Sequence, residues 1–332
     1  MSEKIVAPYP YLRLRRLRQS ASVRALFQEN HLLPSDLICP IFVRGSDDAA
    51  DISTMPGISR YLIDELPKEV EELYNLGIRA VLLFPKTPNH LKTEDAAEAF
   101  NSQNLICQAI RKIKASIPEM TVLTDVALDP YTSHGHDGIL KNDKIENDLT
   151  VEALVKQTLN QVEAGADGIC PSDMMDGRIQ AIRQALEYKK LTDILLISYA
   201  LKYASALYGP FRGAVGANLK GDKMTYQLNP ANSDEALREI QQDIMEGADA
   251  VIIKPGLPSL DIISQAQSFG VPIWAYQVSG EYAMIKYAAM SGALNGEKAF
   301  YEILLSLKRA GASTIITYAA KEMALCLRKN SD

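Results

Sequence analysis

The sequence predicts an α/β protein that folds as a (β/α)8 TIM barrel, and three observations lead to that prediction. Eight short apolar runs recur along the 332 residues, and stretches with helical spacing lie between most of them. Several runs are entered through a glycine that follows a helix, a position where the left-handed conformation suits glycine. Repeated helix–glycine–strand units indicate parallel strands joined by right-handed crossovers, and eight such strands can close a barrel.

The elements can be placed in chain order from these patterns. The expected strands are residues 37–43, 80–84, 121–128, 168–172, 193–199, 250–254, 272–278 and 314–318. Helical spacing is clearest at residues 151–164, 179–189 and 235–245, and the entry glycines are Gly77, Gly165, Gly247 and Gly311. An open doubly wound sheet is the alternative arrangement. No G-x-G-x-x-G motif follows a strand, which weakens the dinucleotide-binding version of that alternative.

Length, charge and cysteine usage restrict the classes of function. A chain of 332 residues fits one barrel of roughly 250 residues with extensions. Its net charge of −6 argues against a general binder of nucleic acid or anionic membranes. The four scattered cysteines lack metal-site spacing, so reduced thiols are expected. The charged N-terminus lacks a signal-peptide core, and no apolar run approaches the roughly 18 residues of a membrane span. We therefore expect a soluble cytoplasmic protein.

The chain divides into an expected N-terminal arm, residues 1–33, and a catalytic barrel, residues 34–332. Residues 9–18 mix arginines with tyrosine and leucine, and arginine is common where subunits meet. We therefore expect the arm to contact another subunit. A nucleic-acid contact and a solvated tail are the alternatives.

Two lysines stand where apolar strands end. Lys254 ends the sixth expected strand, and Lys202 follows the fifth. Lysine is rarely buried without a partner or a task, and in a water-poor site its pKa falls so that the amine can attack a carbonyl. One such lysine suggests a Schiff-base enzyme, and two suggest that two carbonyl substrates are held together. For either lysine, the alternative is a side chain that reaches from a strand end to water.

Further polar residues are expected at the same end of the barrel, where TIM-barrel active sites lie. They are Asp125 in the third strand, Ser172 at the end of the fourth, Ser279 after the seventh and Tyr318 at the end of the eighth. Each alone could be an ordinary cap, but with both lysines they form a coherent set. Residues 208–227 are rich in glycine and carry several cations, so we expect a lid rather than a plain surface loop.

Long strings around these residues resemble the porphobilinogen synthase (5-aminolevulinate dehydratase) family. They are residues 124–126, 131–136, 171–178, 197–205, 208–212, 251–256 and 276–282, in the family's order. The resemblance runs from the arginine-rich N-terminus to Tyr318, nearly the whole chain. It implies a lyase of haem biosynthesis that condenses two 5-aminolevulinate molecules to porphobilinogen with loss of two waters. It also implies that the arm embraces a neighbouring barrel and that the chain forms a homo-oligomer, an octamer.

The resemblance implies a role for each matching residue. Lys254 would form a Schiff base with the first 5-aminolevulinate, and Lys202 would bind the second or form a Schiff base with it. For the first substrate, the resemblance implies that Ser279 and Tyr318 bind the carboxylate and that Asp125 and Ser172 hold the amino group; Asp125 is also implied as a catalytic residue. For the second substrate, it implies that Arg212, Lys223 and Gln227 bind the carboxylate. Tyr276 is implied as a further substrate-binding residue. These types suit the task, because cations bind carboxylates and a carboxylate binds an ammonium. Lys223 stands where many relatives carry arginine, so it gives less geometric control.

The sequence departs from the zinc-dependent branch of the family, which carries three cysteines in this region. This chain has Ala127, Asp129 and Asp137 there, so a thiolate zinc site of that kind cannot form. Hard oxygen ligands suit magnesium or a monovalent cation. The nearby pair His134 and His136 are either ligands or hydrogen-bonded loop residues.

A second metal position follows from the resemblance alone. It implies an allosteric magnesium ion held largely through water at Glu239. That residue lies on an expected helix, where an ordinary solvated glutamate is the alternative.

Two other functions are possible for a barrel of this kind, an aldolase and a non-catalytic scaffold. A class I aldolase of sugar phosphates on the same barrel needs only one Schiff-base lysine, so the second lysine and Tyr318 argue against it. A non-catalytic barrel kept as a scaffold predicts damaged site positions, and the positions named above are intact.

Overall fold

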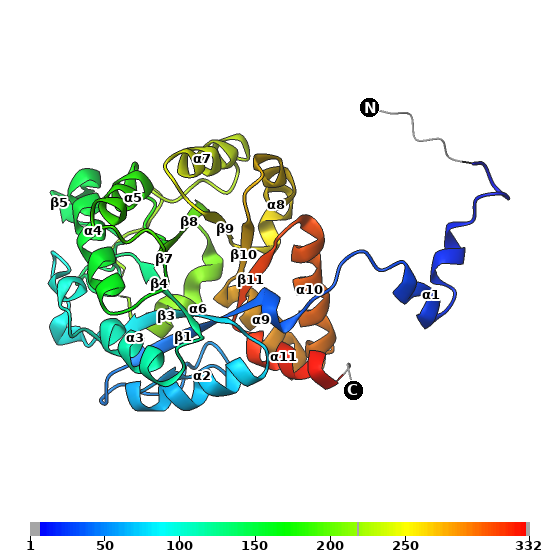
Figure 1. The fold of residues 1–332 in the computed structure, drawn as a ribbon, viewed down its shortest axis with the longest axis horizontal. Coiled ribbons are helices and arrows are strands. Elements are labelled where there is room, and N and C mark those ends of the chain that lie inside the picture. The colour runs from blue at the N-terminus through cyan, green and yellow to red at the C-terminus, as the bar shows by residue number, and fades with distance from the viewer. Residues whose placement is uncertain (1–6, 218, 330–332) are drawn as a thin grey trace. The chain divides into compact units, whose positions relative to one another are not determined.

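Eight parallel strands close a barrel in this computed structural model, which describes residues 7–217 and 219–329 (Figure 1). The strands are β1 Leu37–Arg44, β3 Ala80–Lys86, β4 Thr121–Val126, β7 Gly168–Pro171, β8 Leu195–Lys202, β9 Ala250–Lys254, β10 Ile273–Gln277 and β11 Thr314–Thr317. They pair in this order, and β11 pairs in parallel with β1 to close the ring. The TIM-barrel prediction is confirmed, and each expected strand is present.

Three short strands supplement the barrel. The two residues of β2 Arg60–Tyr61 pair in parallel with the end of β1. The pair β5 Leu140–Lys141 and β6 Lys144–Ile145 forms a small antiparallel hairpin between β4 and the next helix.

Helices alternate with the strands and surround the barrel (Figure 1). They are α2 Leu66–Asn75, α3 Leu105–Ser116, α4 Asn147–Glu163, α5 Arg178–Tyr188, α6 Gly209–Val215, α7 Asp234–Met245, α8 Leu260–Ala266, α9 Ser279–Met290, α10 Gly296–Ala310 and α11 Ala320–Lys329. The three expected helices appear as α4, α5 and α7. Each begins one to four residues before the expected position, because the apolar spacing used to place it starts after the first helical residues.

The core lies inside the barrel and between the strands and the helices. Every residue of β9 is buried, as are the first seven of β1, because barrel strands are covered on both faces. On α2, Leu66, Val70 and Leu73 are fully buried and spaced one turn apart. A side chain of this kind contributes roughly 1.5–3 kcal/mol when it is fully buried. The apolar spacing in the sequence therefore fixes which face of α2 meets the sheet.

The entry glycines have the backbone conformation that the sequence pattern predicted. Gly165 and Gly247 each have a φ of +106°, in the region that side-chain-bearing residues rarely adopt. These two turns connect α4 to β7 and α7 to β9 within a few residues. Short connections of this kind keep successive strands parallel and adjacent.

Strand β8 contains a β-bulge for which the sequence gives no signal. Its register against β9 places Ser198 opposite Val251 and Lys202 opposite Lys254, with a shift between them. Over this stretch β8 therefore contains one residue more than β9. Without the extra residue, Leu201 would lie opposite Lys254. Because side chains alternate between faces with a period of two, the bulge changes which face the last residue of β8 presents.

The expected lid, residues 208–227, is partly helical. Its first part forms α6, in which Ala214 and Val215 are fully buried, and Gly216 ends the helix with a φ of +64°. The helix was not expected, because seven residues are too few for the apolar spacing to repeat.

Residues 7–31 form a unit separate from the barrel, so the division falls two residues before the expected one. This unit contains a 3-10 helix at Leu14–Arg18 and the helix α1 Ala21–Leu26, whose N-terminus is capped by the Ser20 hydroxyl. Its large apolar side chains are exposed, with Tyr11 at 77%. In the described part of the chain, no helix has the length and apolar character needed to cross a membrane.

Candidate active site

The predicted rim residues lie at or next to the C-terminal ends of the barrel strands. Asp125 is in β4, Ser172 directly follows β7, Lys202 and Lys254 are the last residues of β8 and β9, Ser279 begins α9 after β10, and Tyr318 directly follows β11. Since all eight strands are parallel, these positions share one end of the barrel. The two lysines are direct neighbours in the register of β8 and β9.

Lys254 is buried among aromatic rings. Its Nζ lies 4.8 Å from the ring centroid of Tyr276, 4.9 Å from Tyr208, 5.1 Å from Tyr199 and 5.3 Å from Phe211. Burial, and then repulsion from the neighbouring lysine ammonium, lowers the pKa of Lys254 to about 7. A substantial fraction of this amine is therefore uncharged at neutral pH, the form that can attack a carbonyl carbon.

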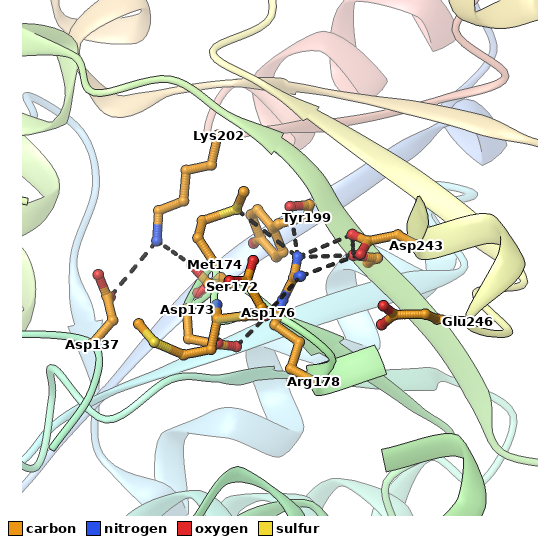
Figure 2. A network of polar contacts seen from close by, with 12 residues as sticks. Asp137, Ser172, Asp173, Met174, Asp176, Arg178, Tyr199, Lys202, Asp243 and Glu246 are labelled. Carbon is orange, nitrogen blue, oxygen red and sulfur yellow. Dashed lines mark hydrogen bonds and ion pairs between the residues drawn. The ribbon is translucent and has the colours of Figure 1, made fainter. Parts of the chain in front are cut away.

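Lys202 sits in more polar surroundings (Figure 2). Its ammonium donates to the backbone carbonyl of Ser172 and lies 3.7 Å from Oδ1 of Asp137. The two lysines therefore differ in kind, since Lys254 faces rings and Lys202 faces oxygen atoms.

Two aspartates and a lysine form a buried cluster beside Lys202. The Nζ of Lys223 lies 3.2 Å from Asp129 Oδ2 and 3.0 Å from Asp137 Oδ2. Burial opposes the ionisation of Asp137, but Lys202 and Lys223 outweigh it and lower its pKa to about 2. The lysine ammonium thus occupies the position between the two carboxylates.

Asp125 is buried, and its Oδ1 has no hydrogen-bond partner among the described residues. Burial raises the pKa of Asp125 to about 7, against the opposing effect of Lys202. An unpartnered buried carboxylate oxygen is costly unless a ligand satisfies it. The side chain can therefore accept a hydrogen bond from a bound ammonium group.

Ser279 and Tyr318, the residues expected to bind the first carboxylate, both have hydroxyl groups that are hydrogen-bonded within the chain. Tyr276 and Tyr318 share a hydrogen bond of 2.9 Å between their hydroxyl oxygens. The Ser279 hydroxyl accepts from the backbone N–H of Phe211 at 3.0 Å and donates to the carbonyl of Leu207 at 3.3 Å. Ser279 therefore contacts the lid helix as well as belonging to the rim.

The cavity between the two lysines is small, with a volume of ≈ 20 Å³. A cavity of that size holds about one water molecule. Its lining residues are Asp129, Lys202, Tyr208, Phe211, Arg212, Lys223, Gln227 and Lys254. Five of them belong to residues 208–227, so this segment forms most of the cavity wall.

The two histidines are engaged by the polypeptide. His136 has Nδ1 3.1 Å from the hydroxyl of Tyr226 and Nε2 2.8 Å from the carbonyl of Lys220. His134 has Nε2 3.3 Å from the carbonyl of Glu94. These contacts fit the alternative of hydrogen-bonded loop residues, and those of His136 connect its loop to the lid.

Glu239, the expected metal residue, does not line the cavity between the lysines. It lies half-buried on α7 and lines a second cavity of ≈ 870 Å³ together with Asp176, Glu235 and lid residues 220–222 and 224–227. Burial, and then the charge of Asp243, raises the pKa of Glu239. No group of three or more histidine, cysteine, aspartate or glutamate side chains in the described part of the chain has a metal-binding arrangement.

Sequence reasoning missed the role of Glu281. This side chain is 1% exposed and accepts from the backbone N–H groups of Gly256 at 3.3 Å, Leu257 at 2.8 Å and Val278 at 2.7 Å. It therefore ties the turn after Lys254 to the start of α9. A glutamate at the third helical position is a capping-box signal, but the sequence does not show that it also reaches the other turn.

Arg60 was missed as well. Its guanidinium group is buried and donates to the carbonyls of Ala214 at 2.7 Å and Gly213 at 3.0 Å, in the last turn of α6. It also donates to the carbonyls of Ala49 and Asp51, both at 2.9 Å. The lid helix is therefore anchored to the barrel at its C-terminal end, by a residue about 150 positions earlier that no local pattern marks.

Comparison with known proteins agrees with this site. The sequence profile described as "Delta-aminolevulinic acid dehydratase" matches residues 11–326. The chain is 50% identical over 321 residues to the delta-aminolevulinic acid dehydratase of Bradyrhizobium diazoefficiens, covering 96% of this chain and 91% of that protein. For the enzyme of Rhodobacter capsulatus, identity is 49% over 324 residues, covering 96% and 98%.

A solved structure is similar over the same range. It is the delta-aminolevulinic acid dehydratase (porphobilinogen synthase) of Toxoplasma gondii ME49, in complex with the reaction product porphobilinogen. The TM-score is 0.94 at 46% identity, and the match covers 96% of this chain and 92% of that one. With the profile match, this leaves no place for the aldolase or scaffold alternatives. The chain therefore belongs to the delta-aminolevulinic acid dehydratase family, a family of hydro-lyases.

Proposed function

We propose that this chain condenses two molecules of 5-aminolevulinate to porphobilinogen, with loss of two waters. The observation that carries the proposal is the pair Lys202 and Lys254, adjacent in register at the active end of the barrel. Each substrate has one ketone group, and loss of each ketone oxygen as water accounts for the two waters. Two amines side by side can hold two such molecules in reacting geometry, and proximity of that kind lowers barriers substantially.

Lys254 supplies the covalent amine for the first substrate. Its uncharged nitrogen attacks the substrate carbonyl, water leaves, and the resulting iminium draws electrons from the adjacent carbon. Asp125 and Ser172 receive the amino group of this molecule, and the unpartnered oxygen of Asp125 supports that role. Ser279 and Tyr318 bind its carboxylate.

The second substrate uses the other lysine and the lid. Lys202 holds its carbonyl, while Arg212, Lys223 and Gln227 bind its carboxylate and Tyr276 borders the site. Because lid residues form most of the wall of a cavity of only ≈ 20 Å³, we expect the segment 208–227 to move and then close over the substrates. Carbon–carbon and carbon–nitrogen bonds then form between the two molecules, and a final deprotonation makes the pyrrole aromatic.

The donor set near Lys202 does not fit zinc. Thiolates are missing at Ala127, Asp129 and Asp137, and the ammonium of Lys223 lies between the two carboxylates. We propose that this ammonium supplies the positive charge there and that the chain belongs to the zinc-lacking branch of the family. A monovalent cation is the other species that these oxygen atoms suit.

Magnesium is proposed at Glu239 as an allosteric ion. Glu239 lines a wide cavity with the carboxylates of Asp176 and Glu235, and it would hold a largely hydrated ion, which suits magnesium. The ion would offset the like charges that gather there. The same cavity is lined by lid residues 220–222 and 224–227, which supports a link to the lid.

We also propose that the chain assembles into a homo-oligomer, an octamer, through its arm. The exposed apolar side chains there, such as Tyr9, Tyr11 and Leu14, support contact with a neighbouring subunit. On the barrel, Met284, Tyr287 and Met290 of α9 are also exposed large side chains, and they lie three residues apart along the helix.

One experiment tests the proposed reaction directly. Purified protein is incubated with 5-aminolevulinate, with and without magnesium, and pyrrole formation is followed with an aldehyde reagent that colours pyrroles. We expect a pyrrole from the parent chain and none from Lys254→Ala. An inactive parent chain under both conditions would rule out the proposal.

A further inference from the structure

The bulge in β8 lies against a buried ion pair between α5 and α7 (Figure 2). Arg178 is the first residue of α5, and Asp243 lies on α7; each side chain is 2% exposed. The guanidinium group contacts both carboxylate oxygens, with Nη1–Oδ1 at 3.2 Å and Nη2–Oδ2 at 3.0 Å. This bidentate geometry fixes orientation as well as charge.

The same guanidinium group holds the bulge itself. Its Nη2 donates to the hydroxyl of Ser198 at 3.2 Å and to the carbonyl of Tyr199 at 3.2 Å. The Ser198 hydroxyl in turn donates to Asp243. The register of β8 shifts directly after Ser198, and a bulge disrupts the ladder hydrogen bonds at that point. Arg178 therefore supplies a donor where the strand ladder is interrupted.

Arg178 also fixes the loop that follows β7. Its Nη1 donates to the carbonyl of Met175 at 3.3 Å, and its Nε lies 3.7 Å from Asp173 Oδ2. Between these residues Met174 has a φ of +71°, a conformation that costs on the order of 1 kcal/mol and persists only when its surroundings hold it. Ser172, whose carbonyl accepts from the second lysine, begins this loop.

We propose that the Arg178–Asp243 pair is a positioning device for the reaction. It locks the bulge of β8 and the carbonyl of Ser172, and thereby keeps Lys202 level with Lys254. The proposal rests on the proposed function, because the register of two lysines matters only if both hold substrate. If the ion pair were purely structural, its replacement would change the stability of the fold without a specific effect on turnover. Buried ion pairs often add little net stability compared with apolar residues of the same size.

The test compares two variants with a matched control. Arg178→Lys keeps the charge but removes the fork, and Ser198→Ala removes the hydroxyl that links the bulge to Arg178 and Asp243 while leaving that ion pair in place. The control is Arg183→Lys, on the same helix, where Nη2 pairs with Asp249 Oδ2 at 2.7 Å away from the bulge. Measurements are kcat, KM, borohydride trapping of 5-aminolevulinate at Lys254, and amide hydrogen exchange of residues 199–203.

We expect Arg178→Lys to lower kcat about ten-fold or more and Ser198→Ala to lower it less, since small misplacements of reacting groups are costly. Trapping at Lys254 should stay within about two-fold of the parent, because three of the four rings around its amine, Tyr208, Phe211 and Tyr276, lie outside the bulge. Exchange at residues 199–203 should become faster in both variants, and the control should match the parent in every measurement.

Three results would overturn the inference. One is a folded Arg178→Lys protein with the parent's kcat. Another is a parallel loss of turnover and Lys254 trapping, which would indicate general destabilisation. The third is unchanged exchange at residues 199–203 in Ser198→Ala. An inactive parent chain is a different outcome, because it would refute the proposed function itself.

Discussion

At the scale of single residues, the two lysines are separated in chemistry by what surrounds them. Lys254 faces four aromatic rings, which offer weak cation–π attraction but no counter-charge, and burial lowers its pKa to about 7. Lys202 faces a carbonyl and a carboxylate, which accept its N–H groups and pair with an ammonium. The first is suited to covalent attack and the second to holding a polarised or anionic group.

The pKa of Lys254 predicts the pH dependence of Schiff-base formation. Below pH 7 the amine is mostly protonated and cannot attack, so the trapping rate should rise about ten-fold per pH unit and level off above about pH 8. The measurement is the initial rate of borohydride trapping of 5-aminolevulinate between pH 5 and 10. A trapping rate that keeps rising to pH 10, as for an ordinary lysine, would contradict the prediction. The control is Lys254→Ala, which should trap no substrate and lose activity by several orders of magnitude.

The cluster of Asp129, Asp137 and Lys223 leads to a prediction about metal removal. Since an ammonium lies between the carboxylates and no thiolate is available, a zinc-selective chelator should leave the rate within about two-fold. Magnesium added to metal-depleted protein should increase the rate. Activity that is lost on chelation and returns only with zinc would show that the cluster was misinterpreted.

At the scale of elements, Glu281 connects two active-site turns. It accepts three backbone N–H groups, two from the turn after Lys254 and one at the start of α9. Burial raises its pKa to about 7, although these hydrogen bonds favour the ionised form. A hydrogen bond to a charged group contributes roughly 1.5–3 kcal/mol, so this carboxylate holds the turns firmly while it is ionised.

Replacing Glu281 with glutamine should loosen both turns, because one oxygen acceptor becomes an amide that faces N–H donors. We expect kcat to fall about ten-fold, corresponding to ~1.4 kcal/mol, together with a lower melting temperature. The control is Glu65→Gln, which alters the same type of cap at Leu62 on an exposed segment. The kinetics are measured below the melting temperature of the variant. A folded Glu281→Gln protein with the parent's kcat would show that Glu281 only caps the helix and does not position the active-site turns.

At the scale of the whole molecule, the arm and Glu239 are proposed to control assembly. The arm exposes large apolar side chains that a monomer leaves in water, and Glu239 lies in a wide cavity bordered by the lid. An ion that binds the assembled state preferentially shifts the equilibrium toward it.

Magnesium should therefore shift the chain toward larger oligomers in sedimentation. Glu239→Ala should lose magnesium stimulation and keep its basal rate, because this residue lies outside the cavity between the lysines. Removal of residues 1–33 should give smaller species with lower activity. A Glu239→Ala protein that responds to magnesium as the parent does would disprove the allosteric site and leave the two-lysine chemistry intact.

Much of the barrel and its rim could be predicted because both depend on local pattern. Strand-length apolar runs mark buried strands, and glycines at helix ends mark the turns that keep the strands parallel. Parallel strands in a closed barrel bring their C-terminal ends to one rim, so Asp125, Ser172, Lys202 and Lys254 could be grouped before their distances were known.

The residues that hold this rim in place depend on contacts that no local pattern records. Arg178 meets Asp243, which is 65 positions away, and Arg60 meets Ala214, which is 154 positions away. The bulge that sets Lys202 opposite Lys254 arises from pairing between two strands, so it appears only when β8 and β9 lie together. The sequence by itself determined the barrel and the chemical groups on its rim, because periodicity and residue type are local properties. Only the tertiary structure decided the register of the two lysines and the contacts that hold the rim in place. The reason is that a buried charge, or a backbone group freed where a strand ladder is interrupted, is satisfied by whichever groups folding brings near.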